Sequence, residues 1–538
     1  MGPFDYVIVG AGSSGCVLAN RLSADPSKRV LLVEGGGTNQ HPFIKMAGGF
    51  VKIMGNPAYF RAFPVKQQPG RRPEMHAYGR GLGGSSAING TWYLPGMPRD
   101  YDAWAEMGLT GWGWSEISRC IARFENYREP GAHPGRGRNG EQQITQSDYK
   151  GPVFDALIEA FEQGGMPWVS DITAPGVTAV GRSQYTVSRS GQRQSTYEAF
   201  VKPVRNRRNL TVATEVAVKR ILFEDHRATG ILCEREGEEV TYSGREVIVS
   251  AGVYGSPQLL QLSGIGPGPD LQRLGLDVVH ENAAVASHLA DHQKMGVSFD
   301  LHNHPGTNRE FVGWRLYRNA LRYFLTRRGP LARVGMPLTG LMSTEGLDDW
   351  PEFQLAAAPF AMRTINEMAE QPGSPLTARP GLTFSGYHLR PRSRGTVRLT
   401  SPSFRDPPLV DPNMWADPYD QAKAIELFHL FRTLAAMPAL AGFIGAERMP
   451  GPGITGEAEI ADAVRKLTEC GLHGTGTCSM GTDPSVSVVD ASCRVHGVDG
   501  LRVVDCSIMP TPVSGNTNGP AIAVAERAAE IISDAASR

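Results

Sequence analysis

The sequence predicts an α/β protein that contains a doubly wound, Rossmann-like nucleotide-binding domain. A short apolar run, Tyr6–Val9, breaks through a glycine-rich turn into a helical pattern over residues 13–22. A second apolar run, Val30–Val33, follows and ends on Glu34. Strand, glycine turn, helix, strand and acid in this order are typical of the first βαβ unit of a dinucleotide-binding fold. At 538 residues the chain exceeds a single hydrophobic core, which predicts roughly two to four domains.

The turn after the first strand carries the glycines of a dinucleotide fingerprint. Gly10 is predicted to make the tight turn, Gly12 to let the backbone approach a pyrophosphate, and Gly15 to allow the helix to pack closely on the strand. The helix then begins at Ser13 and Ser14, where free N–H groups and a partial positive charge favour phosphate oxygens.

Glu34 is the acid that this fingerprint requires. It lies 19 residues after Gly15, and its carboxylate is predicted to hold the ribose hydroxyls. A carboxylate at this point favours an unphosphorylated ribose, since a 2′-phosphate would want an arginine. The alternative is a glycine-rich turn that binds no nucleotide, and the combination of strand, helix, strand and acid argues against it.

Charge and cysteine usage exclude several classes of protein. Lys+Arg and Asp+Glu are equal at 54 each, so no global field favours nucleic acid or an anionic membrane. The seven cysteines are scattered without a CxxC pair, which is typical of a reduced intracellular protein and argues against thiol–disulfide chemistry. The first strand begins by Phe4, which leaves no room for a signal peptide, and no window has about 18 uninterrupted apolar residues. We expect a cytoplasmic protein without a membrane span.

A second glycine-rich segment occupies residues 79–93. Its glycines leave main-chain N–H groups as an anion-binding concavity, and Ser86 and Asn89 can bond polar atoms of a ligand. A flexible linker is the alternative, but Leu82 and Trp92 are too apolar for a linker. We therefore expect this backbone to lie close to a large ligand.

With these segments the chain resembles the glucose-methanol-choline (GMC) flavoprotein oxidoreductases. Residues 99–104 and 256–267 continue the likeness, which extends over nearly the whole chain. The resemblance implies a GMC-type fold, in which an FAD-binding domain is interleaved with an antiparallel β-sheet substrate domain flanked by helices. It also implies that FAD is bound non-covalently, because Ile88 occupies the position where some members carry a flavin-linked histidine.

The resemblance divides the chain into five segments. The FAD-binding domain takes residues 1–152, 194–292 and 463–538, and the substrate domain takes residues 153–193 and 293–462. Strands are expected in the second FAD segment at residues 210–213, 217–224, 229–235 and 246–250. The antiparallel sheet is expected to contain residues 352–357, 383–389 and 396–400, and a helix is expected at 420–434.

The resemblance further implies which residues contact FAD. Beyond the first glycine turn and Glu34, the predicted contacts are Arg80, Gly83, Gly84, Ser86, Asn89, Gly90, Thr91, Trp92, Val218, Ala251, Asp505, Cys506 and Thr517. Val218 would present its backbone to the adenine, and Asp505 and Cys506 would lie beside the flavin. Thr517 would touch the edge of the isoalloxazine.

His473 lies among small residues in the segment 471–481, and the resemblance makes it the catalytic base. Oxidation of an alcohol by hydride transfer to flavin N5 requires loss of the hydroxyl proton, and an imidazole suits that transfer. Asn516 corresponds to the family's second catalytic position. An amide can hydrogen-bond the substrate oxygen but cannot titrate, so a single base must handle the proton.

We therefore expect FAD-dependent oxidation of a primary alcohol to the aldehyde, with electrons passed to oxygen, a quinone or a dye. A lyase of the hydroxynitrile-lyase type and a photodecarboxylase are alternatives on the same fold. The absence of a disulfide pattern argues against the lyase, and the pairing of His473 with Asn516 argues against the photoenzyme. The alcohol, the electron acceptor and the oligomeric state stay open.

Two further stretches allow more than one interpretation. A metal could bind a group of four histidines, but no carboxylate or cysteine cluster completes it, so no metal is predicted at His288, His292, His302 and His304. The stretch Trp314–Arg328 alternates apolar residues with arginines and would suit a membrane surface. We favour an ordinary surface helix whose apolar residues, among them Leu321, Phe324 and Leu325, pack on a core.

Overall fold

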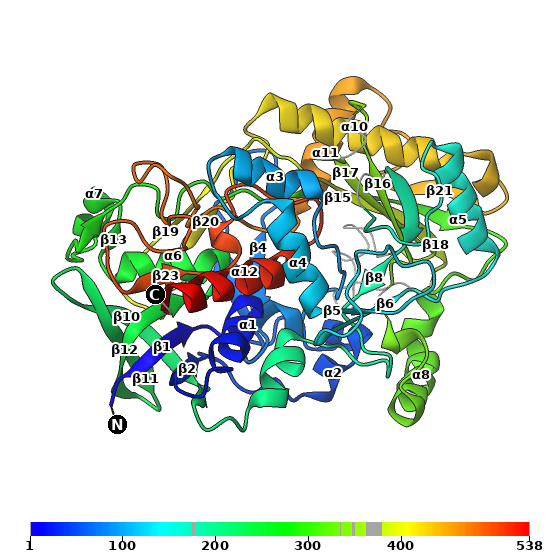
Figure 1. Cartoon of the computed structure of the whole chain (residues 1–538). Coiled ribbons are helices and arrows are strands. Elements are labelled where there is room, and N and C mark those ends of the chain that lie inside the picture. The colour runs from blue at the N-terminus through cyan, green and yellow to red at the C-terminus, as the bar shows by residue number, and fades with distance from the viewer. Residues whose placement is uncertain (1, 175–177, 334, 347–349, 362–378, 537–538) are drawn as a thin grey trace.

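Two seven-stranded sheets form the framework of the molecule, as Figure 1 shows. They come from a computed structural model of the chain, which describes residues 2–174, 178–333, 335–346, 350–361 and 379–536. The first sheet carries the glycine turn, and the second is antiparallel throughout. No helix among the described residues has the length and apolar character needed to cross a bilayer.

The first sheet has the strand order β10-β11-β12-β1-β2-β9, and β23 pairs with β12. Its strands are β1 Phe4–Val9, β2 Val30–Val33, β9 Leu210–Ala213, β10 Val216–Glu224, β11 Arg227–Arg235, β12 Glu238–Val249 and β23 Leu501–Val503. β1 pairs in parallel with both β2 and β12. These central strands are apolar and almost fully buried, as expected of a parallel sheet covered on both faces.

The strand β12 is longer than the sequence predicts, and it belongs to two kinds of pairing. Its first half pairs antiparallel with β11, and its second half pairs in parallel with β1. The first half is mostly exposed and polar, so it lacks the apolar run that marks the buried second half.

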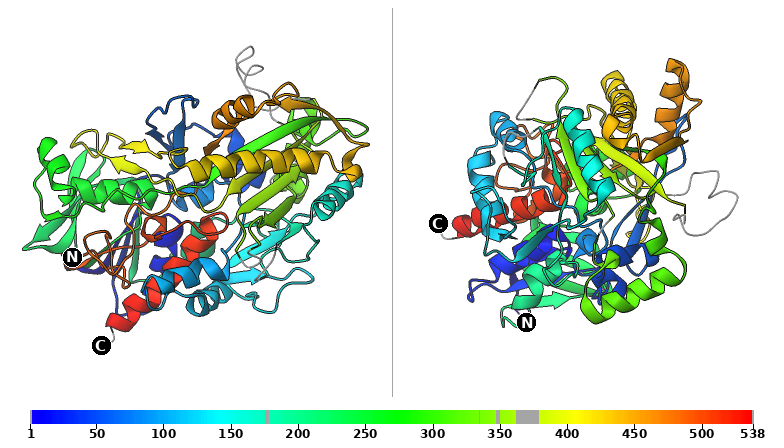
Figure 2. Two further views of the ribbon diagram at one scale, coloured as in Figure 1. Left: turned by 90° about the horizontal axis from the view of Figure 1, so that it is seen from above. Right: turned by 90° about the vertical axis from the view of Figure 1, so that its right-hand side faces the viewer.

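The second sheet has the strand order β21-β15-β18-β17-β16-β7, and β22 pairs with β15. Its strands are β7 Ala179–Arg182, β15 Gln293–Leu301, β16 Leu338–Met342, β17 Phe353–Ala358, β18 Gly381–His388, β21 Ile444–Met449 and β22 Glu469–Cys470. Helices α5 (Pro152–Gln163) and α10 (Pro418–Ala435) share one buried apolar cluster with it, including Phe161, Phe384 and Phe431. Figure 2 shows α10 lying along this sheet.

The prediction that residues 396–400 belong to the second sheet is wrong. The strand β19 (Thr396–Arg398) pairs with β20 (Leu409–Asp411), in a separate two-stranded sheet. Val397 and Val410 are buried in the hydrophobic cluster around the first sheet. The alternation of these residues predicts a strand but does not indicate which core buries its apolar face.

The remaining helices and strands lie outside the two large sheets. The helices are α1 Ser13–Leu22, α2 Pro42–Lys45, α3 Pro98–Glu106, α4 Trp114–Phe124, α6 Gly252–Leu262, α7 Gly268–Arg273, α8 Gly313–Thr326, α11 Glu457–Leu467 and α12 Asn518–Ala536. The remaining strands are β3 Phe60–Pro64, β4 Met75–Gly79, β5 Glu125–Tyr127, β6 Gln142–Gln146, β8 Gln184–Tyr185, β13 Ile265–Gly266 and β14 His280–Glu281.

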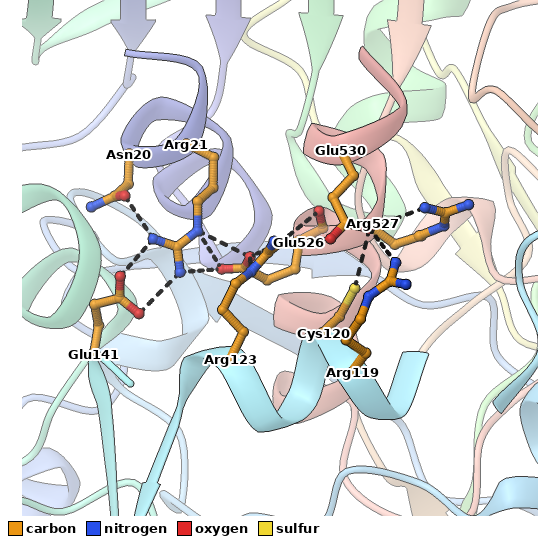
Figure 3. A network of polar contacts seen from close by, with 9 residues as sticks. All are labelled: Asn20, Arg21, Arg119, Cys120, Arg123, Glu141, Glu526, Arg527 and Glu530. Atoms are coloured by element: carbon orange, nitrogen blue, oxygen red, sulfur yellow. Dashed lines mark hydrogen bonds and ion pairs between the residues drawn. The ribbon is translucent and has the colours of Figure 1, made fainter. Parts of the chain in front are cut away.

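A buried carboxylate ties the C-terminal helix to the first one. Glu526 of α12 is fully buried and forms ion pairs with Arg21 of α1 and Arg123 of α4, as Figure 3 shows. Arg21 also pairs with Glu141, with 2.5 Å between the charged atoms. The network therefore joins segments of the chain that are some 500 residues apart in sequence.

Glu526→Ala should lower the free energy of unfolding by about 2–3 kcal/mol, because it leaves Arg21 without its buried partner. Denaturant unfolding of the FAD-loaded protein measures this. Arg119→Gln removes an arginine that is 64 % exposed from the same network, and it should cost less than about 1 kcal/mol. Equal effects of the two changes would contradict this account of the network.

Candidate active site

The two glycine-rich segments lie against each other at the carboxyl end of β1. Gly83 N donates to Ala11 O at 2.8 Å, and a Cβ on Gly84 would lie 2.8 Å from Gly12 Cα. A Cβ on Gly15 would lie 1.9 Å from Gly10 O, so only glycine lets α1 pack this closely on the turn. Nothing lies within 4 Å of the Cβ position of Gly12, which leaves its backbone open to a ligand.

Glu34 holds three turns at the edge of the first sheet. Its Oε2 accepts from Ala11 N at 3.0 Å, and its Oε1 accepts from Gly36 N at 2.8 Å and from Gly81 N at 3.0 Å. A carboxylate can accept about four hydrogen bonds, so capacity for a ribose hydroxyl remains. The acid at the end of β2 and the open backbone at Gly12 together fit a dinucleotide cofactor.

Other predicted cofactor residues lie in the second glycine-rich segment and at the start of α1. Several predicted side chains already make hydrogen bonds within the protein, which fixes their orientation. Ser14 Oγ donates to Ala521 O, Ser86 Oγ to Gly83 O, and Asn89 Oδ1 accepts from Thr91 N. Arg80 is exposed and donates to Gly35 O at 2.9 Å. At Gly90, as at Gly12, nothing lies within 4 Å of the Cβ position.

Asp505 and Ala251 meet beside the glycine turn. Asp505 accepts from Gly252 N at 2.9 Å and from Ser256 Oγ at 2.5 Å, so it joins the end of β23 to the start of α6. Ala251 lies at the end of β12, where its Cα is 3.1 Å from the Cβ position of Gly10. The carboxyl ends of three parallel strands thus converge where such folds bind their ligand.

The remaining predicted cofactor residues come from four separate segments of the chain. Val218 lies on β10 at an irregular part of its pairing with β11, where Lys219 is the extra residue. Cys506 begins a short 3₁₀ helix, and Thr517 is buried just before α12. Trp92 is half-buried beside β8.

The structure brings the two predicted catalytic residues together. His473 Nε2 and Asn516 Nδ2 are 3.0 Å apart, and His473 Nδ1 lies 3.1 Å from Nδ1 of His292. Gln354 Nε2 donates to Asn516 Oδ1 at 3.3 Å, which turns the amide nitrogen of Asn516 toward His473. Because that nitrogen only donates, His473 Nε2 accepts and its proton is on Nδ1. The base atom of this tautomer is Nε2, next to Asn516.

The surroundings of His473 keep its imidazole neutral. Burial, then His292 and Lys294, hold the pKa of His473 well below its ordinary value. Burial likewise lowers the pKa of His292 to about 4. Asp291 fixes the loop, since its Oδ1 accepts from His473 N at 2.9 Å. A neutral imidazole whose Nε2 carries no proton is the form that can accept one.

A row of polar residues on the second sheet faces this pair, and sequence reasoning missed it. Lys294 on β15 is paired with Tyr387 on β18, which is paired with Gln354 on β17. The Tyr387 ring centroid is 5.1 Å from that of His473. Neighbouring strands place such residues on one face, but their sequence positions carry no common signal.

Small residues form the next row along the same face of the sheet. Gly296 is paired with Ser385, which is paired with Ala356. These residues have short side chains or none, so they fill less space above the sheet than Tyr387 and Gln354 do. Lys294 bonds Glu469 across 3.6 Å, and 40 % of its side chain is open to solvent. This part of the face therefore carries small side chains beside one lysine–glutamate ion pair.

The four histidines of residues 288–304 do not converge. His292 alone reaches His473, and His304 Nδ1 accepts from Gly306 N at 3.1 Å. Within the described part of the chain, no three His, Cys, Asp or Glu residues are grouped so as to hold a metal ion.

The chain matches the models of a known protein family over most of its length. Two models described as GMC oxidoreductase match residues 4–305 and 391–525. The chain belongs to the GMC oxidoreductase family. The enzymes of this family that it resembles are FAD-dependent and act on CH–OH donors, so this chain is an FAD-dependent oxidoreductase of that kind.

Two curated relatives are similar over almost the whole chain. An alcohol dehydrogenase (acceptor) of Pseudomonas putida is 34 % identical over 536 residues, which cover 98 % of this chain and 95 % of the relative. An oxygen-dependent choline dehydrogenase of Photobacterium profundum is 34 % identical over 539 residues, which cover 98 % of this chain and 93 % of the relative.

Solved structures confirm the GMC fold. Pyridoxine 4-oxidase from Mesorbium loti has a TM-score of 0.85 and 27 % identity, covering 98 % of each chain. A formate oxidase variant from Aspergillus oryzae RIB40, studied for FAD modification, has a TM-score of 0.90 and 25 % identity, covering 100 % of this chain and 99 % of the other.

Glu34→Gln should weaken FAD retention by about 1–3 kcal/mol, the scale of a lost charge-assisted hydrogen bond. Equilibrium dialysis of FAD measures this, with Glu224→Gln at the end of β10 as the control.

Acid precipitation of the wild type should release all the flavin, since Ile88 has no nucleophile. Flavin that stays in the pellet, or unchanged affinity in Glu34→Gln, would contradict these assignments.

The rate of flavin reduction should be flat through neutral and alkaline pH and should fall only in acid, because the pKa of His473 is lowered. Lys294→Met removes a positive charge that disfavours the imidazolium, so the pKa of His473 should rise and the acid limb should move to higher pH. Anaerobic stopped-flow over a pH series measures this.

The matched control for this pH series is Lys202→Met, which removes an exposed lysine paired with Glu198. Its acid limb should coincide with that of the wild type. An acid limb that stays where it is in the wild type, or moves to lower pH, in Lys294→Met would show that this lysine does not lower the pKa of His473.

Proposed function

We propose that the protein oxidises a primary alcohol to the aldehyde, with His473 as the base. The observation that carries the proposal is the bond between His473 Nε2 and Asn516 Nδ2. An alcohol that replaces this direct bond and lies within reach of both nitrogens gives its hydroxyl proton to Nε2 and accepts a hydrogen bond from the amide. FAD supplies the hydride acceptor when it is bound.

The neighbours of this pair have separate roles in the proposal. Gln354 holds the amide of Asn516 in the orientation that donates toward the substrate. His292 accepts a hydrogen bond from His473 Nδ1–H, which holds the proton on Nδ1 and leaves Nε2 unprotonated. Asn516 stabilises the oxygen as negative charge develops on it, and it takes no part in the titration.

We infer the substrate class from the charges on the row of Lys294, Tyr387 and Gln354. Choline, named in one relative, carries a quaternary ammonium group, and the ion pair of Lys294 with Glu469 leaves no net negative charge on this row to hold that group. Tyr387 and Gln354 beside this ion pair are neutral hydrogen-bonding groups. We therefore assign uncharged primary alcohols to this site.

Two electron acceptors are compatible with the relatives. One relative is named for an unspecified acceptor and the other for oxygen. A lyase or photodecarboxylase remains the alternative function, and bleaching of the flavin by an alcohol under anaerobic conditions separates oxidation from both. Mixing with oxygen and with a dye side by side then identifies the acceptor.

His473→Ala should leave the protein folded and yellow while lowering the anaerobic rate of flavin reduction by about 10²–10⁴-fold, the usual contribution of a positioned base. Asn516→Ala should cost about 10²-fold or less, because it removes one hydrogen bond. His429→Ala, on an exposed position of α10, is the control and should react as the wild type does. Near-normal reduction by His473→Ala would mean that another base is at work.

A further inference from the structure

Helix α8 presents an apolar stripe to solvent. The exposed fractions are 66 % for Trp314, 77 % for Tyr317, 61 % for Leu321, 45 % for Phe324 and 75 % for Leu325. Their spacing of three and four residues places them in one sector, roughly 100° wide. They are five of the ten large hydrophobic side chains that are exposed among the described residues. Half of these exposed apolar side chains are thus gathered on one helix.

The opposite face of α8 already attaches the helix to the protein. Tyr323 is fully buried in a cluster with Met46 and Leu331, and its hydroxyl donates to Lys45 O at 3.1 Å. Asn319 is also buried and donates to Glu310 O at 2.9 Å. The exposed stripe is therefore not needed to hold the helix in place. Of the residues expected to pack on the core, Leu316 does pack on this cluster, whereas the expectation is wrong for Leu321, Phe324 and Leu325.

Arginines lie along one side of this stripe and at its C-terminal end. The helix contains no acidic residue, and the basic residues on it and just beyond its end are Arg315, Arg318, Arg322, Arg327 and Arg328. Among the described residues, Glu310 is the carboxylate that pairs with this group, at 3.8 Å from Arg315 and 2.8 Å from Arg318. The charge of the whole chain is zero, but the charge of this surface is strongly positive.

The position of α8 leaves the stripe accessible. Figure 1 shows the helix at the lower right edge of the molecule, away from both sheets, and the right-hand view of Figure 2 shows it again at the periphery. A flat surface can therefore meet α8 without displacing another element.

We propose that α8 docks the protein on an anionic lipid surface, with the apolar stripe entering the bilayer interface. Trp and Tyr favour the interface between headgroups and hydrocarbon, and leucine and phenylalanine below them bury apolar area. Arginines beside such a stripe bind lipid phosphates. A second copy of the chain is a poorer partner, because a symmetric contact would set the same arginines against one another. This peripheral association with a membrane is a property separate from the proposed alcohol oxidation.

The test is flotation of the FAD-loaded enzyme with vesicles of phosphatidylcholine alone and of phosphatidylcholine mixed with phosphatidylglycerol. The wild type should bind the anionic vesicles more tightly than the neutral ones, and high salt should weaken this binding. The double variant Trp314→Ser, Leu325→Ser and the double variant Arg322→Gln, Arg328→Gln should each bind about tenfold more weakly than the wild type. Alcohol oxidation in solution should not change.

Two control variants alter exposed residues of the same kinds elsewhere. Met107→Ser, Val486→Ser changes apolar side chains, and Arg245→Gln, Arg273→Gln changes arginines, and both should bind vesicles as the wild type does. Failure of the wild type to bind anionic vesicles, or full binding by both α8 variants, overturns the proposal. A dimer that dissociates on Trp314→Ser, Leu325→Ser, without vesicle binding, would assign the stripe to a second copy instead.

Discussion

The hydrogen bond between His473 and Asn516 depends on three segments that meet between the two sheets. His473 follows β22, Asn516 precedes α12, and Gln354 reaches them from β17 of the antiparallel sheet. Burial at this junction lowers the pKa of His473, so the same packing that positions the imidazole also keeps it neutral. Position and protonation state therefore share one physical cause, and a loosened junction would lose both.

The strand, glycine turn, helix and acid at the start of the chain could be predicted from the sequence because their signals are local. The turn from Gly10 to Gly15 and the acid Glu34 lie within one βαβ unit, where glycine geometry and strand ends constrain the backbone directly. The strands β9, β10 and β11 and the helix α10 also follow from periodicity. Periodicity does not indicate the partner of a strand, so the alternation of residues 396–400 does not predict that β19 pairs with β20.

The wall opposite His473 could not be predicted, because its residues meet only through strand pairing. Lys294, Tyr387 and Gln354 are far apart in sequence and are joined by the register of β15, β18 and β17. The apolar residues of α8 show the same limit, since a helical pattern does not indicate which of its two apolar faces is buried. A resemblance to the family indicates the base and the cofactor, whereas this chain's own pairing determines the charge that the substrate meets.

The most direct test of the account is a crystal structure of the FAD-loaded enzyme with a bound, unreactive alcohol analogue. The account predicts that the hydroxyl oxygen lies about 3 Å from both His473 Nε2 and Asn516 Nδ2, on the side of the imidazole away from His292. A hydroxyl bound elsewhere, or an imidazole turned so that Nε2 faces His292, would contradict it.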